Sequence, residues 1–198
     1  MKNLLVFVLA FCLIGLFSCG EKTDDNKTAD NKKTDQKVTE KINPEDFFKA
    51  VKANEVATVK DYLSKDPTLV KAVTTDFLKE TALGISSFNG NKEIVEILLV
   101  KGADPNVNDD MGIAPIIGAA RQNRAEIIEM LIKNKANVNI KNKGDETALH
   151  YAAEYNSGDA AKVLLANGAD KNLKNSSGKT PLDVAKDKKS DKVIELLK

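Results

Sequence analysis

Hydrophobic positions recur along this chain with a step of 33 residues. The mainly apolar stretch at 94–99 returns at 127–132 and again at 160–165. In each copy the apolar residues fall at i, i+1, i+3, i+4 and i+5, which on a helix gives a broad stripe that must be covered. A single helix pair cannot cover its own stripe. Neighbouring pairs therefore cover one another, and the pattern predicts a solenoid of stacked helical units.

Residues that start helices recur at the same step. Thr-Ala-Leu-Gly at 81–84 aligns with Thr-Ala-Leu-His at 147–150 and with Thr-Pro-Leu-Asp at 180–183. Threonine followed by proline is an N-cap followed by the one helical position that needs no N–H donor. Each of these tetrapeptides therefore predicts the start of the first helix of a unit.

The end of the second helix is marked by glycine in two units, Gly102 and Gly168, where a residue with left-handed backbone stops a helix. In the unit between them the equivalent residue is Lys135. We therefore predict that Lys135 adopts the left-handed conformation, at a cost of about 1–2 kcal/mol for a residue with a Cβ atom.

These motifs resemble the ankyrin repeat family, in which a polar turn, a T-P-L-H helix start, a second helix with a leucine pair and a closing G-A-D-x-N sequence make one unit. The resemblance covers about residues 43–198, with four units in register. A degenerate unit comes first, in which Asp66-Pro67 replaces the glycine turn. The resemblance implies an all-α fold, a solenoid of about five helix-turn-helix units with connecting turns. The units are expected at about 44–75, 76–108, 109–141, 142–174 and 175–198.

The first 18 residues are typical of a secretory signal peptide. A short positive start precedes an apolar run at 4–17, which is shorter than the roughly 20 residues of a membrane-spanning helix. Leu16-Phe17-Ser18-Cys19 then resembles a bacterial lipobox, although Phe17 departs from the usual small residue. The resemblance implies that Cys19 is lipidated and becomes the mature N-terminus. A plain signal peptide, cleaved near Ser18 or Gly20, is the alternative.

Residues 19–43 are mostly charged and polar. Such a segment cannot bury enough apolar surface to offset the entropy lost on ordering, so we expect a disordered linker. As a flexible coil of about 24 residues it would reach roughly 25–30 Å, enough to hold the repeats clear of a membrane surface.

Composition excludes several function classes. The net charge is +1 with both signs interspersed, so nucleic-acid binding has no electrostatic basis. Both cysteines lie in the first 19 residues and His150 is the only histidine, so no metal site or cofactor is expected. No nucleophile accompanies the turn carboxylates, so we expect no catalytic residues, no enzyme activity and no small-molecule substrate. For His150 the resemblance implies a structural hydrogen bond between neighbouring turns.

The resemblance also implies a binding surface on the turn tips and on the exposed face of the first helices. At the turn tips the expected partner-binding residues are Phe77, Leu78, Glu80, Asp110, Met111, Ile113, Lys143 and Glu146. On the first helices they are Phe88, Asn89, Arg121, Gln122, Glu154 and Tyr155. For Phe77 and Leu78 the alternative is that both simply cover the first repeat junction.

Taken together, the sequence predicts a monomeric protein-binding module that is lipid-anchored in the bacterial cell envelope, facing the periplasm or the cell exterior. Its expected partner is another protein, and its contact with the membrane is through the lipid alone. Two alternatives stay open: an immunity or inhibitor protein that neutralises a toxin or envelope enzyme, and a structural envelope-assembly factor without a dedicated binding face.

Overall fold

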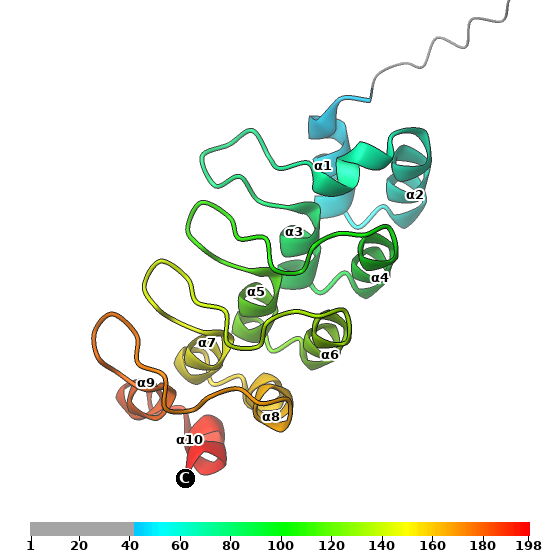
Figure 1. Ribbon diagram of the computed structural model, residues 1–198. Helices are drawn as coiled ribbons and strands as arrows, with labels where there is room; N and C mark the ends of the chain where they lie inside the picture. The colour runs from blue at the N-terminus through cyan, green and yellow to red at the C-terminus, as the bar shows by residue number, and fades with distance from the viewer. Residues whose placement is uncertain (1–41) are drawn as a thin grey trace, which may run out of the picture. The chain divides into compact units, whose positions relative to one another are not determined.

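Two layers of short α-helices make up the part of the chain that the computed structural model describes, residues 42–198 (Figure 1). The inner layer contains α1 (Pro44–Lys52), α3 (Ala82–Asn89), α5 (Pro115–Arg121), α7 (Ala148–Glu154) and α9 (Pro181–Lys188). The outer layer contains α2 (Val56–Lys65), α4 (Lys92–Val100), α6 (Ala125–Lys133), α8 (Gly158–Ala166) and α10 (Asp191–Leu197). The predicted signal peptide, Cys19 and the linker up to residue 41 lie outside the described residues.

Each unit is one inner helix followed by one outer helix, and successive units stack side by side. Helix α3 packs on α5, α5 on α7 and α7 on α9, while α4, α6, α8 and α10 pack in the same order. Loops that connect one unit to the next extend from the inner layer, and we call them the fingers (Figure 1). The described residues are therefore all-α, as the sequence predicts, apart from one isolated antiparallel bridge between Val73 and Thr81 at the base of the first finger.

The core runs continuously between the stacked units. Leu98, Leu131 and Leu164, which occupy equivalent positions of the outer helices, are fully buried. Their burial agrees with the predicted coverage of each apolar stripe by neighbouring units. The inner helices bury large residues such as Leu149 but also small ones such as Ala119 and Ala152, which let neighbouring inner helices approach closely.

The same backbone turn recurs between the inner and outer helix of every unit. A residue with positive φ stands there in all five cases: Asn54, Gly90, Asn123, Asn156 and Lys189. Asparagine tolerates this left-handed conformation better than most residues do. The asparagines also join units: the Asn123 side chain accepts a hydrogen bond from the Ala160 backbone and donates one to Asp159.

The fingers contain a second recurring left-handed position, at Lys79, Gly112, Asp145 and Gly178. Gly112 is required for space as well as for conformation, because a Cβ atom there would lie 2.7 Å from the Lys143 backbone nitrogen. Adjacent fingers are hydrogen-bonded to each other through their backbones, from Asp110 N to Leu78 O at 2.7 Å and from Ser176 N to Gly144 O at 2.9 Å.

Two asparagine side chains join the ends of consecutive units. The Asn106 amide donates to the Lys135 carbonyl at 3.0 Å and accepts from the Asn137 N–H at 2.7 Å. Asn139 repeats both bonds one unit further on, with Gly168 and Asp170. Backbone groups that would otherwise be left unpaired at the helix ends are thereby satisfied across the unit boundary.

The first unit departs from the others where the sequence predicts a degenerate turn. A short 3₁₀ helix, η1 (Pro67–Lys71), replaces the left-handed turn after α2. Asp66 caps it, accepting a hydrogen bond from the Thr68 N–H at 3.0 Å, and Leu69 fills the core. Asn43 caps α1 in the same way through Glu45.

Lys135 has a φ of 72°, which confirms the predicted left-handed conformation at the end of α6. We expect Lys135→Gly to raise the free energy of unfolding by about 1 kcal/mol, since the strain relieved exceeds the extra entropy that glycine gives the unfolded chain. Denaturant titration measures the change. The control is Glu129→Gly, an exposed site in the middle of α6, which should lower stability by about 0.5–1 kcal/mol. Equal losses for both variants would contradict the proposed strain at Lys135.

Ser87 is fully buried in α3, and its hydroxyl has no hydrogen-bond partner among residues 42–198, whereas Ala120 and Ala153 occupy the equivalent positions of the next two units. An unpaired buried hydroxyl costs about 1–3 kcal/mol. We therefore expect Ser87→Ala to raise the free energy of unfolding by about 1 kcal/mol in a denaturant titration.

The matched control is the neighbouring Ser86→Ala. The Ser86 hydroxyl is also buried but donates to the Leu83 carbonyl at 3.2 Å, so its removal should stabilise the protein less. A larger gain for Ser86→Ala than for Ser87→Ala would count against this account of the unpaired hydroxyl.

Candidate protein-binding face

A row of three side chains crosses the ends of successive inner helices. Phe88 lies near the end of α3, Arg121 ends α5 and Tyr155 directly follows α7. The guanidinium carbon of Arg121 lies 5.6 Å from the Phe88 ring centroid and 4.9 Å from the Tyr155 ring centroid. Both distances are within the range of cation–π attraction. We call these three residues the aromatic–arginine row.

The row is accessible to a partner. The exposed fraction is 37% for Phe88 and 46% for Tyr155, and Arg121 is also exposed. The sequence places these residues on the open face of the first helices, and the structure brings them into direct contact with one another. The contact itself could not be predicted, because it depends on the side-chain conformations of three different units.

Tyr151 extends the row and was missed by the sequence analysis. Its ring stacks on that of Tyr155, with centroids 6.3 Å apart and planes 10° apart. Partial burial raises the pKa of Tyr151, and its hydroxyl accepts a hydrogen bond from Asn142 at 3.1 Å. A spacing of four residues on one helix places two side chains on one face, which is the signal that could have revealed this pair.

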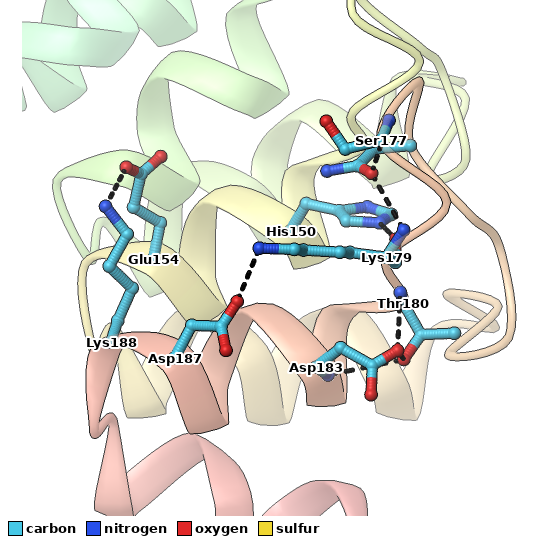
Figure 2. Close-up of polar contacts among 9 residues, drawn as sticks. His150, Glu154, Ser177, Lys179, Thr180, Asp183, Asp187 and Lys188 are labelled. Atoms are coloured by element: carbon cyan, nitrogen blue, oxygen red, sulfur yellow. Dashed lines mark hydrogen bonds and ion pairs between the residues drawn. The ribbon is translucent and has the colours of Figure 1, made fainter.

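Beyond Tyr155 the face continues with ion pairs (Figure 2). Glu154, a predicted partner-binding residue, accepts from Lys188 at 2.8 Å, and Lys179 donates to Asp187 at 2.6 Å. No feature of the sequence singles out Lys188 as the partner of Glu154. Exposed pairs of this kind contribute little to stability. On this face, however, the Glu154 carboxylate is already paired with Lys188.

The first two fingers carry the most exposed apolar side chains of the predicted set. The exposed fraction is 79% for Phe77 and 55% for Met111. Leu78 is half-buried, while Ile113 packs against the core. Phe77 therefore does not cover the first repeat junction, and only Leu78 fits that alternative. Asp110 pairs with Lys79, a residue that the sequence analysis did not select, at 3.2 Å.

The remaining predicted residues differ in how freely they could meet a partner. Lys143 and Asn89 are exposed, and Gln122 is half-buried. Partial burial raises the pKa of Glu80; the charge of Lys52 opposes this shift, and the carboxylates of Asp76 and Asp109 add to it.

Glu146 is also half-buried, and its carboxylate accepts a hydrogen bond from the Asn142 side chain at 3.1 Å. It therefore belongs to the framework of its finger as much as to the face.

Comparison with known protein families bears on this architecture. A model described as "Ankyrin repeats (3 copies)" matches residues 47–142, and one described as "Ankyrin repeats (many copies)" matches residues 131–185. The stack is an ankyrin-repeat solenoid. Ankyrin repeats indicate a protein–protein interaction module, and the aromatic–arginine row lies on the inner helices of this one.

A curated relative shares part of the repeat region. The chain is 39% identical over 66 residues to the serine/threonine-protein kinase VIK of Arabidopsis thaliana. The match covers 33% of this chain and 15% of that kinase. The match therefore involves only a small part of that kinase. The activity in its name is said of that protein alone.

His150 has a structural role in the ankyrin stack. In the neutral form that carries its proton on Nε2, the ring accepts from the Thr147 N–H through Nδ1 at 3.2 Å and donates to the Lys179 carbonyl through Nε2 at 3.1 Å. Lys179 belongs to the next unit (Figure 2), so this is the hydrogen bond between neighbouring turns that the family resemblance implies. Burial of the ring lowers the pKa of His150.

Two kinds of feature are absent from residues 42–198. No group of three or more His, Cys, Asp or Glu side chains in that range is arranged to hold a metal ion. No helix in that range combines the length and the apolar character needed to cross a membrane.

We predict that protonation of His150 destabilises the ankyrin stack. Because folding lowers its pKa below the ordinary value of 6.5, the unfolded chain binds the proton more readily than the folded chain. The stabilisation is complete above that value and is lost as the pH falls through it toward the folded-state pKa.

Chemical denaturation from about pH 7.5 to about pH 5.5 measures this effect. The wild type should lose stability across that window, and His150→Asn, although less stable throughout, should lose less. Parallel pH curves for the two proteins would contradict the assignment.

Proposed function

We propose that this protein is a lipid-anchored ankyrin-repeat module of the bacterial cell envelope that binds another protein through the inner-helix face and the fingers. The observation that carries the binding part of the proposal is the aromatic–arginine row. Aromatic residues and arginine are the residue types most enriched among interface hot spots. Here they meet on an exposed surface. The fingers add the exposed apolar side chains of Phe77 and Met111.

The location of the face also supports binding over a purely structural role. The stability of the stack depends on the residues between units, such as Leu131, which is fully buried. The row lies outside that core and is not needed to cover it. Exposed apolar side chains gathered in one area are typical of interaction sites on otherwise polar surfaces.

The anchor is proposed from the sequence of residues 16–19. Leu16-Phe17-Ser18-Cys19 resembles a lipobox and follows an apolar run of signal-peptide length. The charged linker would then separate the repeats from the membrane. Together, anchor and linker would hold the binding face within reach of envelope proteins while contributing no contact of their own.

Paired measurements on variants separate the face from the framework. Leu131→Ala should lower the free energy of unfolding by about 2–5 kcal/mol because it leaves a cavity between units. Phe88→Ala, Arg121→Ala and Tyr155→Ala should cost no more than about 1 kcal/mol each, the order of the exposed cation–π contacts that they remove. Denaturant titration gives these values. Face variants as unstable as Leu131→Ala would show that the row belongs to the framework.

Crosslinking in living cells tests the binding function. A photoreactive residue at Gln122, beside the row, should capture a specific protein that mass spectrometry identifies, while the same residue at Lys162 on α8 should not. Each face variant should then weaken binding of that protein by about 1 kcal/mol or more. Stable face variants that bind the captured protein as tightly as the wild type would refute the role of this face.

The anchor is tested separately with Cys19→Ser. In detergent phase partitioning of whole cells, the wild type should enter the detergent phase and the variant the aqueous phase, since multiple acyl chains hold a protein stably at a membrane. The control is Cys12→Ser, which changes a cysteine inside the apolar run and should leave partitioning unchanged. Equal partitioning of Cys19→Ser and wild type would refute lipidation at this residue.

A further inference from the structure

Arg121 has no acidic partner among the described residues. Eight lysines in residues 42–198 form ion pairs with Asp or Glu side chains, but Arg121 forms none. The acidic residue next to it on the face, Glu154, is bound by Lys188 at 2.8 Å. The positive charge of Arg121 is therefore not neutralised by an ion pair within residues 42–198.

The contacts of Arg121 also decide which part of the side chain a ligand can reach. The Phe88 ring lies on the α3 side and the Tyr155 ring on the α7 side of the guanidinium group. Aromatic rings attract the face of a cation, and they offer its N–H groups no acceptor oxygen. Guanidinium carries five N–H donors and no acceptor, in a fork that matches the two oxygens of a carboxylate. The rings therefore hold Arg121 in place, while no side-chain or backbone oxygen of the described residues accepts a hydrogen bond from its guanidinium group.

From these observations we infer that the aromatic–arginine row is a carboxylate subsite for an Asp or Glu side chain of the partner protein. The carboxylate accepts from the Arg121 guanidinium, and apolar residues beside it in the partner sequence pack on Phe88 and Tyr155. The inference rests on the proposed function, because it specifies the chemistry of the partner at the proposed face.

The charges around the row favour a singly charged group. Arg121 is a single cation, and the carboxylates of Glu154 and Glu146 belong to the same face. A doubly charged phosphate needs more positive charge than one guanidinium supplies, and Lys188, the other cation on this part of the face, is already paired with Glu154. One carboxylate is the anion that a single arginine neutralises.

The probe is a library of random peptides displayed through their C-termini, so that no free terminal carboxylate competes. Selection against the intact folded protein should return peptides with Asp or Glu at one fixed position, flanked by apolar residues. The best peptide is then synthesised with amidated ends, together with its Glu→Gln or Asp→Asn counterpart, and both are titrated calorimetrically.

Wild type should bind the acidic peptide at least about tenfold more tightly than its amide counterpart, the order expected for a charge pair at an interface. Arg121→Gln should abolish this preference, and Arg121→Lys should restore only part of it because lysine lacks the planar fork. Lys162→Gln removes one positive charge from the outer helix α8 and should retain the full preference.

The outcomes separate the inference from the proposed function. Peptides that bind, that depend on Phe88 and Tyr155, and that show no acidic preference would overturn the carboxylate subsite while supporting the face. An acidic preference that survives Arg121→Gln would also overturn it. A selection that yields no binding peptide, or only peptides that tolerate alanine at all three row positions, would contradict the proposed face and with it the subsite.

Discussion

The fold depends on one constraint, which is that no helix pair in this chain can bury its own apolar stripe. Leu98, Leu131 and Leu164 are fully buried only because another unit covers each of them. This coverage is the main favourable contribution to the free energy of folding, since burying a leucine side chain contributes roughly 1.5–3 kcal/mol. The hydrogen bonds of Asn106 and Asn139 across unit boundaries fix the spacing of the units but could not replace that burial.

The same constraint creates the proposed binding face. Stacking places equivalent positions of successive inner helices next to one another, so that residues about 33 apart in the sequence become neighbours. Phe88, Arg121 and Tyr155 come from three units and form one continuous surface for this reason. A repeat structure thus produces an extended site without long loops, because the regular spacing of the framework positions the side chains.

Prediction from the sequence succeeds where the position of a residue within the repeat determines its structure. The register of the helices, the burial of Leu131 and the left-handed conformation of Lys135 all follow from the position of a residue within its repeat. It failed where one unit differs from the rest. The 3₁₀ helix η1 has no counterpart in the other units, and the unpaired hydroxyl of Ser87 appears only once its surroundings are known.

The candidate site was predictable in position but not in chemistry. The face residues were selected because a repeat leaves those positions exposed, and the structure does place Phe88, Arg121 and Tyr155 at the surface. Whether Arg121 pairs with a carboxylate or with aromatic rings depends on competition among its neighbours. Lys188 takes Glu154, and this leaves the rings as the partners of Arg121. The spacing of residues in the sequence does not predict which of these neighbours pairs with Arg121.

Framework and face are therefore separable in this protein for a physical reason. Core positions between units tolerate little change, because a cavity there removes contacts from two units at once. Face positions make few contacts that the fold requires, so their side chains can vary with small effects on stability. A stack of this kind can present different chemistry on a constant scaffold. Here that chemistry is a cation held between two rings, and among residues 42–198 no acidic side chain forms an ion pair with it.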